Sequence, residues 1–343
     1  MKHWKPAEEH LHAAAEALRC GLLVGMPTET VYGLAGNALD AQAVADIFAV
    51  KGRPTFDPLI VHAADTEAAF RYVREVPEVA RRLAERFWPG PLTLVLPRDP
   101  ELPDLLSAGL DTLALRVPAH PLARALLRSC GVPLAAPSAN RFGRISPTRA
   151  EDVLEELGGD ARVAGVLDAG CCDLGVESTV VGFPGPGRVR VYRLGGLPLE
   201  DLRGALEETG TDLEWVDVRD AEDDPELAKR GEQSPGMLAR HYAPRTPMCL
   251  LAADAPAPEI GLGTSMDAGT GWLGFQSVPE GVTGPVELLS AQGDLREAAT
   301  RLFACLRRLD SAGATRIVAW RVPDTGLGRA INDRLSRAAL VRN

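Results

Sequence analysis

The stretch "KGRPTFDPL" carries two cations, Lys51 and Arg53, whose types and spacing could do chemistry. They lie at the end of a helical pattern that Gly52 and Pro54 stop. Two cations held this close repel each other, and a polyphosphate would relieve that repulsion while accepting charge-assisted hydrogen bonds. The same pair would also suit the C-terminus of a helix, where cations complement the helix dipole. The spacing alone leaves both interpretations open.

A second polar stretch, "AAPSANRFGRISPT", carries more hydroxyl and amide groups than a turn needs. They are Ser138, Asn140, Ser146 and Thr148. Such side chains bind phosphate or ribose, and so do the main-chain N–H groups of the helix expected to begin near Pro147. Ordinary helix capping, with a capping box from Thr148 to Glu151, is the alternative. Capping explains Thr148, but it does not explain Ser138, Asn140 or the arginines of the stretch.

Further polar residues lie in or beside strand-like stretches. Arg116, in "TLALRVP", needs a carboxylate or phosphate partner if it is buried, and that partner could be internal or a ligand. Ser178 and Thr179 stand at the mouth of the strand in "GVESTVVGF", where they could donate to an anion or satisfy the edge of the sheet. Arg193 precedes two glycines that permit close backbone approach. For His62, which ends "PLIVH", a structural hydrogen bond is favoured over a ligand contact.

Several familiar sites are missing from the sequence. It has no G-x-x-x-x-G-K-[ST] phosphate loop and no G-x-G-x-x-G fingerprint, so a nucleotide would have to be bound by another design. No two cysteines form a C-x-x-C pair, which favours reduced thiols, and the adjacent pair Cys171 and Cys172 is interpreted as packing rather than as a metal site. Open α/β sheets bind ligands at strand ends, where the polar stretches above occur.

Composition narrows the class of protein. A length of 343 residues favours two domains, and 45% apolar residues with 34 glycines and 27 prolines indicate a loop-rich globular α/β protein. The formal net charge is −10 and neither half is basic, which argues against a protein that mainly grips a nucleic-acid backbone. Residues 1–21 are interpreted as an amphipathic helix with Pro6 in its first turn, not as a signal peptide. No apolar run approaches the roughly 20 residues that cross a bilayer, so we expect no membrane association and a cytoplasmic location.

The elements that must position these side chains alternate between strands and helices. Strands are expected at "LLVGM", "PLIVHA", "LTLVLP", "TLALRVP", "VPLAAPS", "RVAGVLDAG", "STVVGF" and "VRVYRLG". Helices are expected at 41–54, 77–87, 120–130 and 148–157. Some of these strands are adjacent in sequence and others are separated by helices, which predicts a twisted mixed sheet with helices packed against it.

The chain changes character after residue 200. Residues 212–232 are rich in acidic side chains and predict a solvated connector or a short helix with a charged face. "SPGMLARHYAPRTP" then predicts an extended, specific segment. We therefore expect a domain at 1–200, a linker at 201–247 and a smaller α/β domain at 248–343. In this last part the strands are "MCLLAA", "GTGWLGF" and "TRIVAWRV" and the helices span 292–311 and 328–341.

Seven blocks of this sequence resemble the YrdC/Sua5 family in order and spacing. They are "PTETVYGLAGNA", "KGRPTFDPLIVHA", "WPGPLTLVL", "LALRVPAHP", "PLAAPSANRFGRISPT", "GVESTVVGF" and "YRLGG". With "SPGMLARHYAPRTP" and a trailing domain, the chain resembles the longer Sua5 form. The resemblance implies a twisted mixed sheet with a large concave cavity, followed by a smaller Rossmann-like α/β domain.

The activity implied by the resemblance is L-threonylcarbamoyladenylate synthesis, a nucleotidyl transfer. L-threonine, bicarbonate or CO2, and ATP with Mg²⁺ would give threonylcarbamoyl-AMP and pyrophosphate. Downstream enzymes would then pass the threonylcarbamoyl group to the N6 of adenosine 37 of tRNA. Lys51 and Arg53 would be catalytic, through positioning and charge neutralisation rather than as nucleophiles.

The resemblance also assigns ligands to residues. Those expected to bind ATP are Lys51, Arg53, Thr112, Ser138, Asn140, Ser146, Arg193 and Tyr242. Those expected to bind L-threonine are Thr30, His62, Arg116, Ala136 and Ser178. Tyr242 would fold over the nucleotide as a lid. The metal ligands stay unassigned. The family often has Arg-Pro-Gly where this chain has Arg193-Leu194-Gly195, which frees the backbone at that corner.

Two other functions remain to be separated from this one. The concave surface could bind double-stranded RNA in a ribosome-associated module, although the acidic totals and sparse aromatics oppose it. The chain could also be a carbamoyl-handling domain like that of hydrogenase maturation proteins, but it shows none of the zinc-finger cysteine spacing that accompanies those domains. Pyrophosphate release from ATP separates the three.

Overall fold

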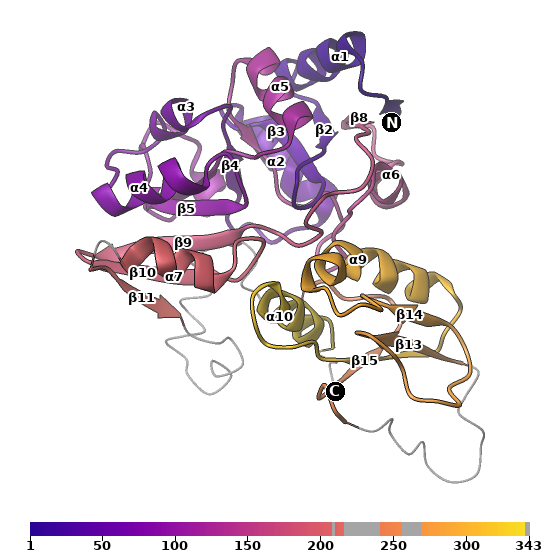
Figure 1. Ribbon diagram of the computed structural model, residues 1–343. Helices are drawn as coiled ribbons and strands as arrows, with labels where there is room; N and C mark the ends of the chain where they lie inside the picture. Colours follow the sequence, from indigo (N-terminus) through magenta and orange to yellow (C-terminus); the bar gives the residue numbers. More distant parts are fainter. Residues whose placement is uncertain (208–209, 216–240, 256–268, 340–343) are drawn as a thin grey trace. The chain divides into compact units, whose positions relative to one another are not determined.

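The computed structural model describes residues 1–207, 210–215, 241–255 and 269–339 (Figure 1). The chain forms two compact units. The first comprises Met1–Phe142, Pro147–Asp173 and Glu177–Leu238, and the second comprises Gly143–Ser146, Leu174–Val176 and Ala239–Asn343. Two short segments of the N-terminal sequence thus belong to the second unit. The boundaries expected at residues 200 and 247 stay a prediction.

The first unit is built on a mixed sheet of eleven strands in the order β1-β8-β2-β3-β7-β4-β6-β5-β9-β10-β11. The strands are β1 (Lys2–Trp4), β2 (Leu23–Met26), β3 (Gly33–Asn37), β4 (Ile60–His62), β5 (Leu92–Pro97), β6 (Thr112–Arg116), β7 (Leu134–Ala135), β8 (Val163–Leu167), β9 (Thr179–Gly185), β10 (Arg188–Arg193) and β11 (Asp212–Trp215). Parallel pairs such as β4 with β6 alternate with antiparallel pairs such as β5 with β6. The mixed α/β class predicted from the sequence is confirmed.

The helices of the first unit connect and cover these strands. They are α1 (Glu8–Arg19), α2 (Ala41–Lys51), α3 (Thr66–Phe70), α4 (Glu78–Phe87), the 3-10 turn η1 (Asp104–Ser107), α5 (Pro121–Cys130), α6 (Ala150–Leu157) and α7 (Leu199–Glu207). Asp40 caps α2 by accepting hydrogen bonds from the N–H groups of Gln42 and Ala43, and Gly52 ends it with φ 63°. A left-handed residue is cheapest as glycine, so the helix stops where the sequence predicted.

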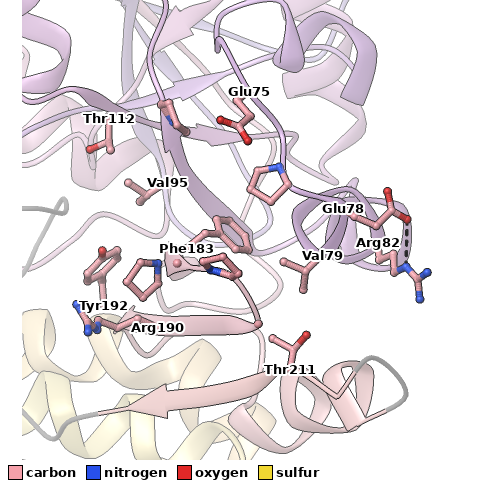
Figure 2. A pocket seen from close by; sticks show the side chains of 16 residues that line it. Glu75, Glu78, Val79, Arg82, Val95, Thr112, Phe183, Arg190, Tyr192 and Thr211 are labelled. Atoms are coloured by element: carbon pink, nitrogen blue, oxygen red, sulfur yellow. Dashed lines mark hydrogen bonds and ion pairs between the residues drawn. The ribbon is translucent and has the colours of Figure 1, made fainter.

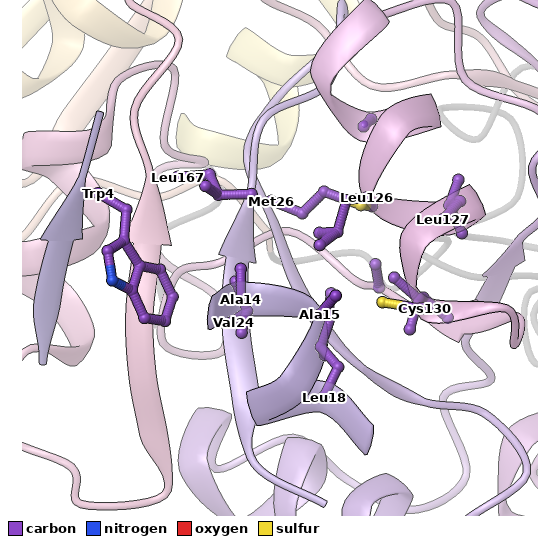
Figure 3. Packing of buried hydrophobic residues seen from close by; sticks show 14 residues of the cluster. Trp4, Ala14, Ala15, Leu18, Val24, Met26, Leu126, Leu127, Cys130 and Leu167 are labelled. Carbon is purple, nitrogen blue, oxygen red and sulfur yellow. The ribbon is translucent and has the colours of Figure 1, made fainter. Parts of the chain in front are cut away.

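A buried apolar cluster holds α1 and α5 against the sheet (Figure 3). Ala14, Ala15 and Leu18 of α1 meet Leu126 and Leu127 of α5 over the strands β2 and β8. Burial of such side chains is worth about 1.5–3 kcal/mol each for the larger ones, so this layer contributes substantially to the stability of the first unit.

The first residues differ from the expected helix, because residues 2–4 form strand β1. β1 pairs in parallel with β8, and Trp4 is buried against Gly165, where an added Cβ would lie 2.5 Å from the indole ring. Helix α1 begins only at Glu8, with Ala7 as its N-cap. The packing of Trp4 on Gly165 stabilises an extended conformation here more than the local helical pattern stabilises a helix.

The prediction of a solvated connector at 212–232 was also partly wrong, because residues 212–215 form strand β11. It pairs in parallel with β10, and Glu214 accepts hydrogen bonds from Arg190 Nε at 3.0 Å and Nη2 at 2.8 Å. An edge strand can carry such charges on its partly exposed face. Residues 216–240, which include most of the expected linker, lie outside the described residues.

The second unit contains a four-stranded parallel sheet in the order β12-β15-β13-β14. Its strands are β12 (Met248–Leu251), β13 (Thr270–Gly274), β14 (Val286–Leu288) and β15 (Arg316–Trp320), and its helices are α9 (Leu295–Ser311) and α10 (Leu327–Ala339). Trp272 of β13 stacks on Trp320 of β15 with ring centroids 6.0 Å apart. Parallel strands alternating with helices agree with the Rossmann-like α/β prediction. Within the described part of the chain, no helix is both long enough and apolar enough to cross a membrane.

Candidate active site

Several of the polar residues singled out in the sequence lie in one row across five adjacent strands. His62 of β4 is paired with Arg116 of β6, and the antiparallel register of Leu94 with Leu115 places Thr93 of β5 beside Arg116. Thr93 is in turn paired with Val180 of β9, and Val180 with Arg193 of β10. Neighbouring strands are about 4.8 Å apart, so this row spans roughly 19 Å. The sheet therefore aligns His62, Arg116 and Arg193, which are far apart in sequence.

Arg116 has an internal partner, which answers the question left open by its sequence. Its Nη2 donates to Glu29 Oε1 at 2.6 Å, its Nη1 to Thr30 Oγ1 at 2.9 Å, and its Nε to the carbonyl of Gly90 at 3.2 Å. Both charged side chains are buried, at 4% and 7% exposure. The site residues expected from the sequence included Thr30 but not Glu29. The acidic residue next to Thr30 in "PTETVYG" was the signal that could have identified it.

His62 lies next to Arg116 as a neutral imidazole. Burial, followed by the positive charge of Arg116, lowers the pKa of His62 to about 3. Its Nδ1 forms no hydrogen bond with the residues that the structure describes. Hydrogen bonding with the main chain of Ile60 and Leu134 acts in the opposite direction on the pKa, so the structural role favoured from the sequence stays a prediction. At neutral pH the ring can offer one donor and one acceptor.

Ser178, just before β9, forms a second polar group with Thr93 and Arg193 of the same row. Arg193 donates from Nε at 3.1 Å and from Nη2 at 2.9 Å to the Ser178 carbonyl, and its Nη2 also lies 3.0 Å from Ser178 Oγ. Ser178 Oγ is 2.7 Å from Thr93 Oγ1. Thr179, by contrast, serves the sheet edge, since its hydroxyl donates to the Leu197 carbonyl at 2.6 Å. Thr93 is a polar neighbour that sequence reasoning missed because it is an isolated hydroxyl in an apolar strand.

Gly195 lets the chain after Arg193 approach the main chain of residues 177–179 closely, as the two glycines after Arg193 suggested. A Cβ at Gly195 would lie 2.3 Å from the Glu177 carbonyl oxygen and 2.5 Å from the Thr179 nitrogen. We expect Gly195→Ala to lower the free energy of unfolding by about 1–3 kcal/mol, because backbone must move to admit the methyl group.

Gly204→Ala is the matched control, because Gly204 lies inside α7 and an added Cβ there meets open space. It should be neutral or stabilise by up to about 1 kcal/mol. Urea unfolding midpoints of the two variants provide the comparison. Equal midpoints would contradict the close approach at Gly195.

Lys51 lies in another polar group, at the end of α2. Its ammonium donates to the carbonyl of Ser138 and, at 2.6 Å, to that of Asn140, and its own carbonyl accepts from the Phe142 N–H at 2.8 Å. The end of α2 and the loop of 138–142 are therefore joined. Burial, followed by the charge of Arg53, lowers the pKa of Lys51 well below its usual range. The charge of Arg53 thus opposes protonation of Lys51, as the sequence suggested, while the charge of Asp57 favours it.

Arg53 is held by its own turn. It pairs with Asp57 Oδ1 at 2.8 Å and donates to the carbonyls of Asp57 at 3.0 Å and Pro58 at 2.9 Å. Pro58 is four residues before His62, or roughly 13 Å along the strand direction. The cations at the end of α2 and the row through Arg116 thus lie toward opposite ends of β4.

Apolar side chains lie between these two polar ends. Ile60, Val95, Ala114 and Val180 form a buried cluster with Tyr192 packed against it. Ala136 is joined to this region, since its N–H donates to the Ile60 carbonyl at 3.0 Å. Apolar side chains thus separate the cations at the end of α2 from those of the row through Arg116.

Thr112 lines a cavity of about 980 Å³ at the end of β6 (Figure 2). Val95 and Tyr192 belong both to this cavity and to the apolar cluster. Phe183, the β9–β10 turn and Val79 of α4 line another side of the cavity (Figure 2). The cavity therefore reaches the apolar cluster at the end of β6 opposite Arg116. Among the expected ligand residues that the structure describes, Thr112 alone lines it.

The two remaining expected ATP ligands, Ser146 and Tyr242, belong to the second unit. Ser146 is buried, and the preceding carbonyl of Ile145 accepts from Arg307 Nη2 of α9 at 2.6 Å. The ring of Tyr242, a residue with φ 65°, stacks on Phe303 at 5.7 Å, and the guanidinium of Arg334 lies 4.9 Å from it. The lid role of Tyr242 stays a prediction.

The N-terminus of helix α6, after the polar loop, is not capped by the expected capping box of Thr148 and Glu151. Helix α6 begins at Ala150, and it is Asp152 that accepts from the N–H groups of Thr148 at 2.9 Å and Arg149 at 3.0 Å. The expected pairing of Thr148 with Glu151 was wrong by one residue. Glu151 instead lies near His3 and Asp168.

His3, Glu151 and Asp168 each offer one atom that can bind a metal, and these atoms lie within 4.8 Å of one another. However, Lys5 Nζ lies 2.6 Å and His3 Nε2 3.0 Å from Asp168 Oδ2. Since an ammonium group already supplies the positive charge, we assign no metal there. This group stands apart from the row through Arg116: His3 lies in β1, Glu151 in α6 and Asp168 just after β8.

Comparison with known proteins places this geometry in a family. The family model described as "Telomere recombination" for Sua5, YciO and YrdC matches residues 16–195. This chain belongs to the Sua5/YrdC family. A second model, described as "Threonylcarbamoyl-AMP synthase, C-terminal domain", matches residues 198–340, so the resemblance inferred from the seven sequence blocks is confirmed.

Similar proteins cover nearly the whole chain. Threonylcarbamoyl-AMP synthase of Bacillus subtilis is 40% identical over 95% of this chain and 92% of its own length, and that of Pyrococcus abyssi is 37% identical over 99% and 95%. The crystal structure of P. abyssi Sua5 complexed with L-threonine matches with a TM-score of 0.84 and 36% identity, over 98% of this chain and 96% of that one. E. coli YciO, at TM-score 0.50 and 25% identity, covers 57% of this chain.

Proposed function

We propose that this Sua5/YrdC protein is a threonylcarbamoyl-AMP synthase. The observation that carries the proposal is the match along nearly the entire chain to two proteins of that name, in both sequence and, for P. abyssi Sua5, structure. L-threonine and ATP are its proposed substrates, with bicarbonate or CO2 as the third. Double-stranded RNA binding as the main function finds no support in these relatives.

The proposed chemistry needs no nucleophile from the protein. The amine of threonine adds to CO2 to form a carbamate and loses a proton, and a carbamate oxygen then attacks the α-phosphorus of ATP. The bond from the α-phosphorus to the bridging oxygen breaks, and pyrophosphate leaves with the electron pair. The protein then contributes orientation and charge stabilisation, and holding reactants together can supply several kcal/mol of the barrier reduction.

The row through Arg116 is the proposed threonine end. Arg116 has a guanidinium fork suited to a carboxylate, and His62, kept neutral by burial, provides a hydrogen-bonding group that does not repel the cationic side of the amino acid. Thr30 and Ser178 contribute hydroxyls from the neighbouring turn and strand. Ala136 leaves room because its side chain is small.

The end of α2 is the proposed triphosphate end. Lys51 supplies charge beside Ser138 and Asn140, with Arg53 in the next turn. Thr112 and, from the row through Arg116, Arg193 are further proposed ATP ligands. The same role for Ser146 and Tyr242 of the second unit stays a prediction. Mg²⁺ would neutralise the phosphates. The buried carboxylates Glu29 and Asp57 are already paired with arginines, so we propose that the ion enters with ATP and is held mainly by phosphate oxygens and water.

Pyrophosphate release from ATP tests the proposal. We expect release to require both L-threonine and bicarbonate, and threonylcarbamoyl-AMP to form in equal amount by mass spectrometry. Release that is unchanged when threonine is omitted would contradict the assignment. Salt-sensitive retention of duplex RNA at near-physiological ionic strength, without such release, would favour the RNA-binding function instead.

We propose further that the product serves the modification of adenosine 37 in tRNA through downstream transfer enzymes, in the cytoplasm. These steps follow from the proposed activity, since a labile mixed anhydride must be consumed by an acceptor in the same compartment.

A further inference from the structure

Glu29 is a buried carboxylate outside the residues to which the family resemblance assigns a ligand. It lies in the turn between β2 and β3, with 6% of the residue exposed. Its Oε1 accepts the hydrogen bond of Arg116 Nη2 at 2.6 Å. Burial works to raise the pKa of Glu29, but the charge and hydrogen bond of Arg116, with the main-chain N–H groups of Glu29 and Ala119, lower it overall. The carboxylate therefore stays ionised at neutral pH.

A buried ion pair needs a reason, because desolvation of two charges often exceeds their attraction. Holding a side chain in one geometry is such a reason. An arginine has five N–H donors in one plane. In Arg116 three of them are used, by Glu29, Thr30 and the carbonyl of Gly90, which come from the turn before β3 and from the start of β5.

These partners fix the plane of the guanidinium and leave it two donors. One N–H on Nη1 and one on Nη2 take part in none of the hydrogen bonds that the described residues form with Arg116. Nη1 and Nη2 are neighbouring nitrogens in one plane, and one N–H from each can bind the two oxygens of a carboxylate.

Hydrogen bonds of Thr28 and Thr30 fix the conformation of the turn that carries Glu29. Thr28 Oγ1 lies 2.7 Å from Thr30 Oγ1 and donates to the Val31 carbonyl at 2.6 Å, and it also accepts from the N–H of Thr30 at 3.2 Å. The side chains on both sides of Glu29 are thus locked before any ligand binds. A preorganised partner of this kind costs little when the substrate arrives.

We infer that Glu29 is a positioning residue for amino-acid recognition, which holds Arg116 so that its two remaining N–H groups receive the substrate carboxylate. This inference rests on the proposed function, in which Arg116 binds the carboxylate of threonine. Glu29 also balances the charge of Arg116, so that binding depends on the direction of the donors more than on the net charge.

Two variants test the inference, Glu29→Ala and Glu29→Gln. In pyrophosphate-release kinetics, we expect Glu29→Ala to raise the KM for L-threonine at least tenfold and to change the KM for ATP by less than about twofold. Glu29→Gln keeps an oxygen that accepts from Nη2, so its KM for threonine should lie between those of wild type and Glu29→Ala. Melting temperatures show whether each variant is folded.

A second measurement reports on carboxylate recognition itself. Wild type should prefer L-threonine over L-threoninamide, which lacks the carboxylate, and Glu29→Ala should lose most of that preference. Calorimetric titration with L-threonine in the absence of ATP gives the same comparison without turnover. Asp168→Asn is the matched control, because it removes another carboxylate paired with cations in the same unit, and its KM values should equal those of wild type.

The outcomes separate the inference from the function on which it rests. Wild-type protein that releases no pyrophosphate with threonine would contradict the proposed function. An active wild type with an unchanged threonine KM in Glu29→Ala would overturn the inference alone. Equal rises in the KM for ATP and for threonine, with the preference over threoninamide intact, would also overturn it, since Glu29 would then be merely structural.

Discussion

Replacing Arg116 by alanine is expected to cut threonine-dependent pyrophosphate release to below about one hundredth of the wild-type rate, a loss of about 3 kcal/mol in transition-state stabilisation. The same change should lower the free energy of unfolding by about 3–5 kcal/mol, because Glu29 would remain as a buried charge without its partner. Steady-state kinetics and denaturant unfolding measure the two effects separately.

A double variant distinguishes loss of the site from loss of the fold. Arg116→Met with Glu29→Met removes both charges and fills the space with apolar atoms, so it should recover most of the stability while staying inactive. If the double variant regained activity along with stability, Arg116 would be structural and the threonine end of the proposed site would be misplaced. If it were as unstable as Arg116→Ala, the stability effect would not come from the orphaned carboxylate.

Lys51→Met is expected to lower kcat/KM for ATP by about 10²–10³, the range seen when one preorganised donor to a developing charge is removed. Methionine keeps much of the length of the side chain but cannot donate to the loop of Ser138 and Asn140 or meet a phosphate. Lys5→Met is the matched control, since Lys5 is an exposed lysine of the same unit, and its kinetics should not change. An effect on threonine KM alone would contradict the assignment of Lys51 to ATP.

Lys51 should also make stability and ATP binding depend on pH. Its pKa is lowered in the folded protein but has the usual value of about 10.4 in the unfolded chain. Between these two values the unfolded chain binds more protons, so the stability of the free protein should rise with pH through that window, and this rise should vanish in Lys51→Met. ATP favours the protonated ammonium, so its affinity should fall as pH rises through the lowered pKa. A free energy of unfolding that does not rise between neutral pH and pH 10 would contradict this coupling.

Much of the fold could be predicted from local pattern. The apolar runs became strands β2, β4, β5, β6 and β8 close to their expected places, and α2, α4 and α5 begin and end near their Gly and Pro signals. These elements carry their own information, because periodicity and turn residues act over a few positions. The strands β1, β3, β11 and β14 were missed. Of these, β1 and β11 each depend on a partner elsewhere: β8 for Trp4, and the arginines of β10 for Glu214.

For the candidate site too, some features follow from the sequence and others only from the tertiary structure. The sequence by itself determined which residue types are present at strand ends, and its seven ordered blocks determined the family. Only the tertiary structure decided that His62, Thr93, Arg116 and Arg193 share one row, since strand order is a matter of long-range pairing. It also decided that the partner of Arg116 is Glu29, because a buried cation takes the carboxylate that folding brings near it, and these two residues are 87 positions apart.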